Sequence, residues 1–220
     1  MSVSIVVHDK RLEGRTPVST PGFMSLDVNE GTPLEYFFDR CRSISEAQRG
    51  ISTLYIMTHG AKSASAGESD EDSGIILCQE FVHLGNVDRF AAMAGIVEHI
   101  VLLIFLPAAT SFDIHLLETA GPKLSSTFHG GDELSRQMAI HANARVTGAR
   151  ETQLYAAEEH CTTFAGNEIY CEAGFVDFGE WEGTIIQYDA KGNLLAEWTN
   201  PSAWRDSQGV LRDPRLEPRP

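Results

Sequence analysis

Two apolar runs in the sequence lead directly to residues that could take part in chemistry. The run 51–57 (ISTLYIM) leads to His59 and Gly60, and the run 99–104 (HIVLLI) leads to Phe105. In open parallel sheets, functional groups gather at the carboxyl ends of the central strands. His59 is therefore the first candidate for a functional side chain, with acid–base chemistry as the use of its imidazole.

Both runs are continuously apolar, which is typical of strands buried on both faces of a parallel sheet. Apolar residues at helical spacing, together with capping residues, indicate helices between the strands. Strands that alternate with helices predict an α/β fold, with a mostly parallel central sheet flanked by helices. The expected elements are strands at 4–8, 51–57, 74–78, 81–84, 99–106, 144–147 and 153–156, and helices at 32–50, at 86–95 and from 132 onward.

Three stretches show no such periodicity. Residues 9–31 are polar and rich in glycine, and residues 61–73 are small and acidic, which predicts a mobile loop directly after His59. Residues 107–130 form a long loop, and loops of that length in a compact domain are usually functional or disordered.

The end of the chain has a different character. From residue 174 the pattern is that of β-structure, and a hairpin is expected around Gly192 and Asn193. We therefore expect an α/β domain at 1–172, a C-terminal hairpin at 173–204 that packs on the same domain, and a flexible tail at 205–220.

An ordered series of segments carries a resemblance to a known family. LYIMTHG, GIILCQEFVHLG and IVLLIFLPAAT follow one another, and GGDELSRQMAIHA and ARVTGA come after them. The series resembles the caspase-like (clan CD) cysteine peptidases, including bacterial members of the wider group. That family places a His-Gly pair after one central strand and its nucleophilic Cys after the next long strand, with a small hairpin between them. The resemblance covers residues 50–157 and implies a three-layer α/β domain.

The resemblance assigns roles to three positions. His59 matches the catalytic histidine, which acts at the scissile carbonyl and protonates the leaving amine. Gly60 matches the glycine whose backbone N–H helps to bind the oxyanion. The nucleophile position falls on Phe105, within one residue, and neither Phe105 nor its neighbours Ile104 and Leu106 can attack a carbonyl. The resemblance therefore implies a peptidase that has lost its nucleophile.

Other side chains keep an active hydrolase open as an alternative. Cys78 lies in the expected hairpin and would have to project toward the strand ends, whereas Thr110 and Ser111 follow the end of the second apolar run. Cys161 is more distant in the sequence. No third residue that would orient the imidazole of His59 is identifiable from the sequence.

The sequence predicts neither a cofactor nor a metal. It contains no HxxEH motif, no GxGxxG after the first strand and no GxxxxGK[ST]. Residues 158–161 and Cys171 form the nearest cluster of ligand-type residues, which is typical of a solvated acidic turn. The four cysteines include no CxxC pair and are expected to be reduced thiols.

Composition restricts the partners and the location. A net charge of −14 with only 17 Lys and Arg residues disfavours a nucleic-acid partner. The longest apolar run, 100–109, has about half the length of a membrane span, and the run at 3–7 is too short for a signal peptide. We therefore expect a cytoplasmic protein with no membrane association.

The leading hypothesis is a caspase-like pseudopeptidase with a binding or regulatory role, which is compatible with a protein or peptide partner. The first alternative is an active cysteine or serine hydrolase with a displaced nucleophile. The second alternative is a flavodoxin-like ligand-binding domain, with a pocket lined by residues 9–31 and 107–130.

Overall fold

The computed structural model describes a defined set of residues, and Thr110, Ser111 and Cys161 lie outside it. The described residues are 2–12, 16, 19–62, 73–105, 130–150, 156–158, 163–164, 167–168, 175–177, 183–199, 204–205, 207–209, 211–213 and 216–217.

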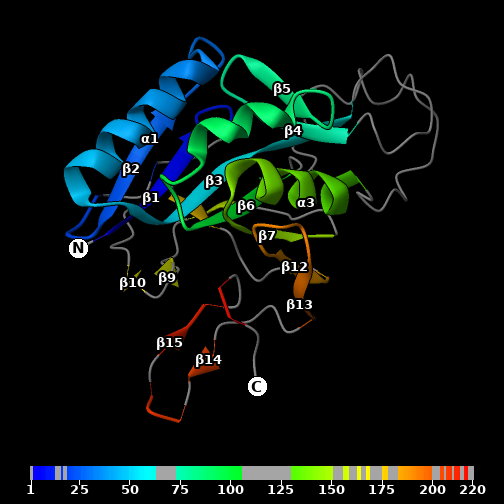
Figure 1. Ribbon diagram of the computed structural model, residues 1–220. Helices are drawn as coiled ribbons and strands as arrows, with labels where there is room; N and C mark the ends of the chain where they lie inside the picture. The colour runs from blue at the N-terminus through cyan, green and yellow to red at the C-terminus, as the bar shows by residue number, and fades with distance from the viewer. Residues whose placement is uncertain are drawn as a thin grey trace.

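A nine-stranded sheet in the order β13-β12-β7-β6-β3-β1-β2, with β4 on β3 and β5 on β4, forms the centre of the described structure (Figure 1). Strands β2, β1, β3, β6 and β7 pair in parallel, and the other pairs are antiparallel. This arrangement confirms the predicted α/β fold with a mostly parallel sheet. The strands are β1 (Val3–Asp9), β2 (Phe23–Val28), β3 (Ile51–Lys62), β4 (Ser73–Leu77), β5 (Glu80–His83), β6 (His99–Phe105), β7 (Arg145–Ala149), β12 (Ile185–Tyr188) and β13 (Leu194–Trp198).

Short strands outside this sheet form three antiparallel pairs. The pairs are β8 (Ala156–Glu158) with β11 (Phe175–Asp177), β9 (Thr163–Phe164) with β10 (Asn167–Glu168), and β14 (Trp204–Arg205) with β15 (Leu211–Arg212). The strand expected at 153–156 falls largely outside the described residues, which include β8 from Ala156.

The described helices are α1 (Leu34–Gln48), the 3-10 helix η2 (Val87–Met93) and α3 (Gly130–Ala142). Helix α1 forms as predicted, because its buried residues recur at helical spacing, and it ends at Arg49 in the left-handed conformation. The helix expected at 86–95 is the 3-10 helix η2 instead. Asn86 does not cap it, because the Asn86 side chain donates to the Phe81 carbonyl and accepts from the His83 amide.

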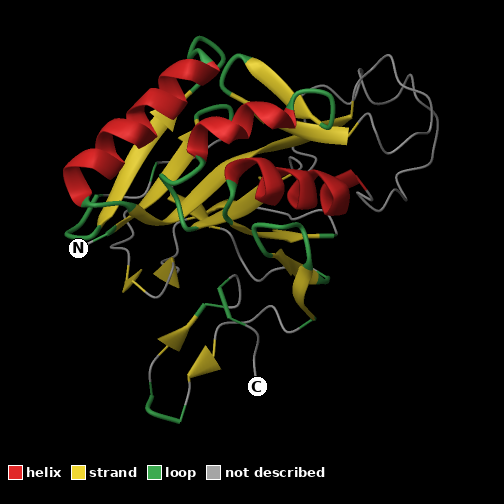
Figure 2. Cartoon of the chain, viewed as in Figure 1, coloured by secondary structure: helices red, strands yellow, loops and turns green. Residues whose placement is uncertain are grey.

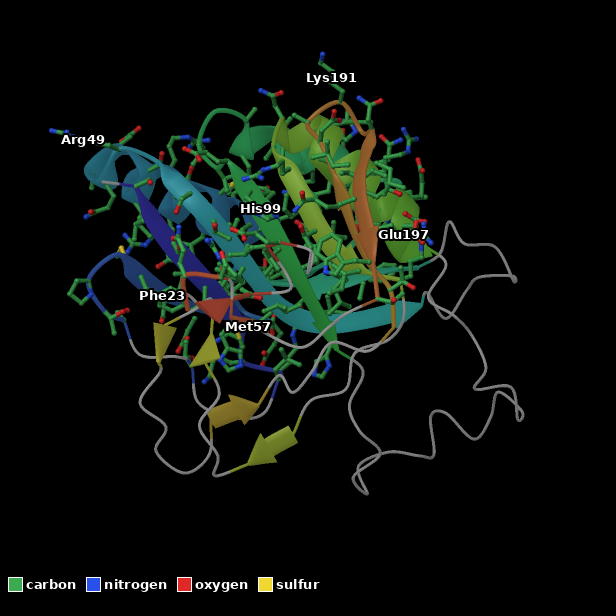
Figure 3. All side chains as sticks on the ribbon, turned by 90° about the horizontal axis from the view of Figure 1, so that it is seen from below. Phe23, Arg49, Met57, His99, Lys191 and Glu197 are labelled. Atoms are coloured by element: carbon green, nitrogen blue, oxygen red, sulfur yellow. The ribbon has the colours of Figure 1, made fainter. Side chains whose placement is uncertain are left out.

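Two hydrophobic cores lie on opposite faces of the sheet, because successive side chains of a strand alternate between the faces. The first core joins one set of strand residues to side chains of α1, η2 and α3, all of which lie on one side of the sheet (Figure 2). The second core contains the alternate residues, among them Tyr55, Met57 and Phe23, and Figure 3 shows that face from below. The described helices thus form a single layer, and a second helical layer remains an expectation.

Strand β3 continues past the predicted end at Met57, and this changes the setting of His59 and Gly60. The sequence predicts that both residues follow the strand, whereas β3 runs to Lys62 and contains them. The reason is an exchange of neighbours: β1 pairs with β3 as far as Met57, and β4 then pairs with β3 from His59 onward.

Strand β2 was not predicted, because residues 9–31 are polar and rich in glycine. Ser25 and Asp27 interrupt the apolar residues of β2, and its burial is partial. A strand at the edge of a sheet tolerates this composition, since only one side of its backbone is paired.

Part of the predicted tail, 205–220, contacts the sheet. Asp213 is buried, and Leu216 packs against the second core. At the sheet edge, β12 and β13 pair around a turn in which Asp189 accepts hydrogen bonds from the Lys191 and Asn193 amides.

We predict that Gly74→Ala disrupts the hairpin of β4 and β5. A Cβ at Gly74 would clash with the Val82 carbonyl oxygen and lie 2.9 Å from the Phe81 ring, so the hairpin would have to shift. The expected loss is about 3 kcal/mol in the free energy of unfolding, measured in urea. Gly22→Ala is the control, because its Cβ meets nothing within 4 Å at a φ of +82°. This control should lose about 1 kcal/mol, and equal losses in both variants would contradict the clash.

Candidate functional site

His59 and Phe105 are neighbours on two adjacent parallel strands at the centre of the sheet. Their Cα atoms are register partners in the pairing of β3 with β6, and Phe105 is the last residue of β6. Adjacent strands lie about 4.8 Å apart. The two positions that the sequence singles out therefore lie side by side at the carboxyl end of the parallel sheet.

The half-buried imidazole of His59 is oriented by a main-chain carbonyl. Its Nε2 lies 3.1 Å from the carbonyl oxygen of Arg11, in the turn that follows β1. A carbonyl oxygen only accepts, so Nε2 is the donor, and the lone pair of the neutral ring lies on Nδ1. Alternation along β3 places His59 on the same face of the sheet as Tyr55 and Met57, which belong to the second core.

The turn that contacts His59 contains an ion pair whose carboxylate is fully buried. Asp9, the last residue of β1, is fully buried, and the guanidinium of Arg11 donates to both of its carboxylate oxygens, with Nε 2.7 Å from Oδ1. The amide of Arg11 also donates to Oδ1. The turn closes with a bond of 2.9 Å from the Leu12 amide to the Asp9 carbonyl.

The same ion pair holds the hairpin of β4 and β5. Nη2 of Arg11 donates to the carbonyl of Cys78 at 2.7 Å and to that of Ile76 at 3.3 Å. The Cys78 amide donates to Oδ2 of Asp9, and the Thr58 hydroxyl donates to the Ile76 carbonyl. The ends of β1 and β4 and the centre of β3 are thus joined in one hydrogen-bonded network.

A second imidazole, that of His8, supports the turn. Nε2 of His8 donates to the Leu12 carbonyl at 3.1 Å, and Nδ1 lies 2.9 Å from the hydroxyl of Thr16, which also contacts Asp27. Burial, and then the charge of Lys10, lower the pKa of His8 to about 4. His8 is therefore neutral at physiological pH.

Cys78 has the surroundings of a structural cysteine. Its side chain is fully buried in the first core, on the face opposite His59, and its backbone has a φ of 58°. Burial, and then the charge of Asp9, raise the pKa of the Cys78 thiol to about 12. Because the thiolate is the nucleophile, these features disfavour Cys78 as an attacking group.

The other sequence-predicted positions are less informative. Gly60 is buried and pairs with Ile75, and its role as an oxyanion donor stays a prediction. Ser111, Thr110 and Cys161 lie outside the described residues, as do all ligand-type residues of the acidic turn except Glu158.

Among the described side chains, no three His, Cys, Asp or Glu residues are grouped as metal ligands. In the same part of the chain, no helix is long and apolar enough to cross a bilayer.

The sequence did not single out Asp9 and Arg11. In the structure the Arg11 carbonyl contacts His59, and Asp9 binds the side chain of Arg11. The signal was available in part, because HDKR follows the first apolar run as THG follows the second. The carboxyl ends of parallel strands meet at one edge of a sheet, so charged residues after the first run are expected to lie near His59.

We predict that acid destabilises the fold through two neutral, buried histidines. Burial lowers the pKa of His8 to about 4 and that of His99, with a further contribution from Arg145, to about 3. In the unfolded chain these histidines bind protons near pH 6.5. Their contribution to the free energy of unfolding is therefore fully present above that pH and is lost as the pH falls toward their folded-state pKa values. At about 1.4 kcal/mol per pKa unit, the loss is on the order of 3 kcal/mol for His8 and 5 kcal/mol for His99.

Urea unfolding at a series of pH values measures this loss, and His99→Gln is the informative variant. Nε2 of His99 lies 2.8 Å from the Thr147 hydroxyl, which a glutamine can also contact. The variant should show a shallower fall of stability between pH 6.5 and 3. A wild-type profile that is flat over that range would contradict the prediction.

We also predict that Arg11→Met is strongly destabilising, because it leaves the carboxylate of Asp9 buried without its cation. Removing one partner of a buried pair costs about 3–5 kcal/mol. Arg42→Met is the matched control, since the Arg42–Asp39 pair is exposed and should contribute less than about 0.5 kcal/mol. Comparable losses in the two variants, measured by urea unfolding, would argue against a structural role of the Asp9–Arg11 pair.

Comparisons with known proteins found no relative of this chain. No family model, no curated protein and no solved structure matches the chain.

Proposed function

We propose that the chain is a caspase-like domain that has lost its nucleophile and acts as a binding or regulatory module, a pseudopeptidase. The observation that carries this proposal is the register pairing of His59 with Phe105 on adjacent parallel strands. A cysteine peptidase needs a histidine beside a cysteine, and these two register-paired positions hold a histidine and a phenylalanine.

Two further features support the proposal. The Arg11 carbonyl orients the imidazole of His59, as a third group orients the base in nucleophilic hydrolases. The hairpin of β4 and β5 lies between β3 and β6 in the sequence, as the resemblance requires. The proposal includes a three-layer domain, a cytoplasmic location and a protein or peptide partner.

The sheet order also favours a second candidate, a flavodoxin-like ligand-binding domain. Strands β2-β1-β3-β6-β7 follow the order 2-1-3-4-5 of that fold, in which ligands bind beside the first and third strands. Against this candidate, the turn at that point is filled by internal hydrogen bonds, because Asp9, Arg11 and His8 all bond to neighbouring protein atoms.

The substitution Phe105→Cys tests the proposal directly. We expect wild-type protein to show no peptidase activity and no rapid alkylation by iodoacetamide. A cysteine at position 105 would lie beside His59, which should favour the thiolate and speed alkylation about threefold to tenfold relative to Phe105→Cys/His59→Ala. Mass spectrometry of the modified peptide measures the rate at this position.

Glu197→Cys, an exposed position on β13, is the control, and its alkylation rate should not depend on His59. Two results would count against the proposal. One is an alkylation rate at position 105 that is unaffected by His59→Ala. The other is a single fast-reacting cysteine in the wild type whose replacement by Ala abolishes a peptidase activity, which would instead establish an active hydrolase.

A further inference from the structure

The turn of residues 9–12 forms bonds on both faces of the sheet. On the side of the first core, the carboxylate of Asp9 binds the side chain of Arg11 and the amide of Cys78. On the other side, the main-chain carbonyl of Arg11 accepts from His59. The segment that fixes His59 is therefore itself fixed by Asp9.

Peptide geometry explains how the turn directs this carbonyl. The Arg11 carbonyl and the Leu12 N–H belong to one planar trans peptide unit, so they point in opposite directions. The Leu12 N–H donates to the Asp9 carbonyl at 2.9 Å, which turns the Arg11 carbonyl outward from the turn, toward His59.

The side chains of Asp9 and Arg11 hold the turn in this conformation. Oδ1 of Asp9 accepts from the Arg11 amide at 3.2 Å and from Nε at 2.7 Å, which restrains Arg11 at both its main chain and its side chain. The guanidinium is then held at its far end by the carbonyls of Ile76 and Cys78. A buried ion pair is by itself weak evidence of net stability, whereas its geometry can specify one conformation.

We propose that Asp9 is a positioning residue for His59. Through Arg11, it holds the main-chain carbonyl that keeps the imidazole proton on Nε2 and leaves Nδ1 as the basic nitrogen. The importance of this tautomer for recognition rests on the proposed function, whereas the tautomer itself can be measured without it. His8, which directly precedes Asp9, also restrains the turn, because its Nε2 donates to the Leu12 carbonyl.

The test is the tautomer of His59 in Asp9→Asn, which removes the charge but keeps the size of the side chain. Two-bond nitrogen–proton correlation spectra at about pH 8, where histidine is ordinarily neutral, report which ring nitrogen carries the proton. His59→Gln assigns the His59 signals among those of the eight histidines. We expect the wild type to populate the Nε2–H form, and the ratio of Nε2–H to Nδ1–H to fall about fivefold to tenfold in Asp9→Asn.

Glu80→Gln is the matched control, because it also removes a carboxylate from this region. Glu80 lies on the same hairpin, but its carboxylate pairs with Arg89 and not with Arg11. Its tautomer ratio at His59 should equal that of the wild type. Arg11→Lys keeps the positive charge but loses the two-pronged contact with Asp9, so it should give an intermediate ratio, and it serves if Asp9→Asn does not fold. An unchanged ratio in both Asp9→Asn and Arg11→Lys would overturn the inference.

Combining each variant with Phe105→Cys separates this inference from the proposed function. A changed tautomer ratio without any effect of His59 on alkylation would support the role of Asp9 and count against the pseudopeptidase. An unchanged tautomer ratio together with His59-dependent alkylation would do the reverse.

Discussion

The fully buried carboxylate of Asp9 is the constraint on which the candidate site depends. A charge with no exposure to water must be paired and hydrogen-bonded, or folding would have to neutralise it at a large cost. The carboxylate of Asp9 accepts hydrogen bonds from the side chain and the amide of Arg11 and from the amide of Cys78. Cys78 lies in the turn between β4 and β5. Satisfying one carboxylate therefore fixes the turn after β1 and the position of β4 at the same time.

This constraint also explains why β3 can be longer than its parallel neighbour. β1 ends at Asp9, and beyond that point β3 would have an unpaired edge. The antiparallel pairing of β4 with His59 through Lys62 covers that edge, and the Asp9–Arg11 pair holds β4 in place through the Ile76 and Cys78 carbonyls. His59 consequently lies in a paired strand, where its backbone is restrained on both sides by β4 and β6.

The parts of the fold that were predictable are those that the apolar pattern determines locally. The buried cores of β3 and β6 and the apolar face of α1 follow from runs and spacings within a few residues. Strand β2 was missed because Ser25 and Asp27 break its pattern, and the end of β3 was missed because THGAK contains no large apolar residue. The network at the site was not predictable, since its bonds join Asp9 to Cys78 and Arg11 to His59, and neither pair shares a local pattern.

The bond from His59 to the Arg11 carbonyl is compatible with both a catalytic and a purely structural role of this histidine. A catalytic imidazole needs such an orienting partner, but the same bond also ties β3 to the turn after β1, and this structural function does not require a nucleophile. A histidine can therefore remain at this position after catalysis is lost. Phenylalanine, the residue at position 105 on the adjacent strand, has no lone pair with which to attack a carbonyl. Under the proposed function, the residue at position 105, rather than the presence of His59, distinguishes a pseudopeptidase from an active peptidase.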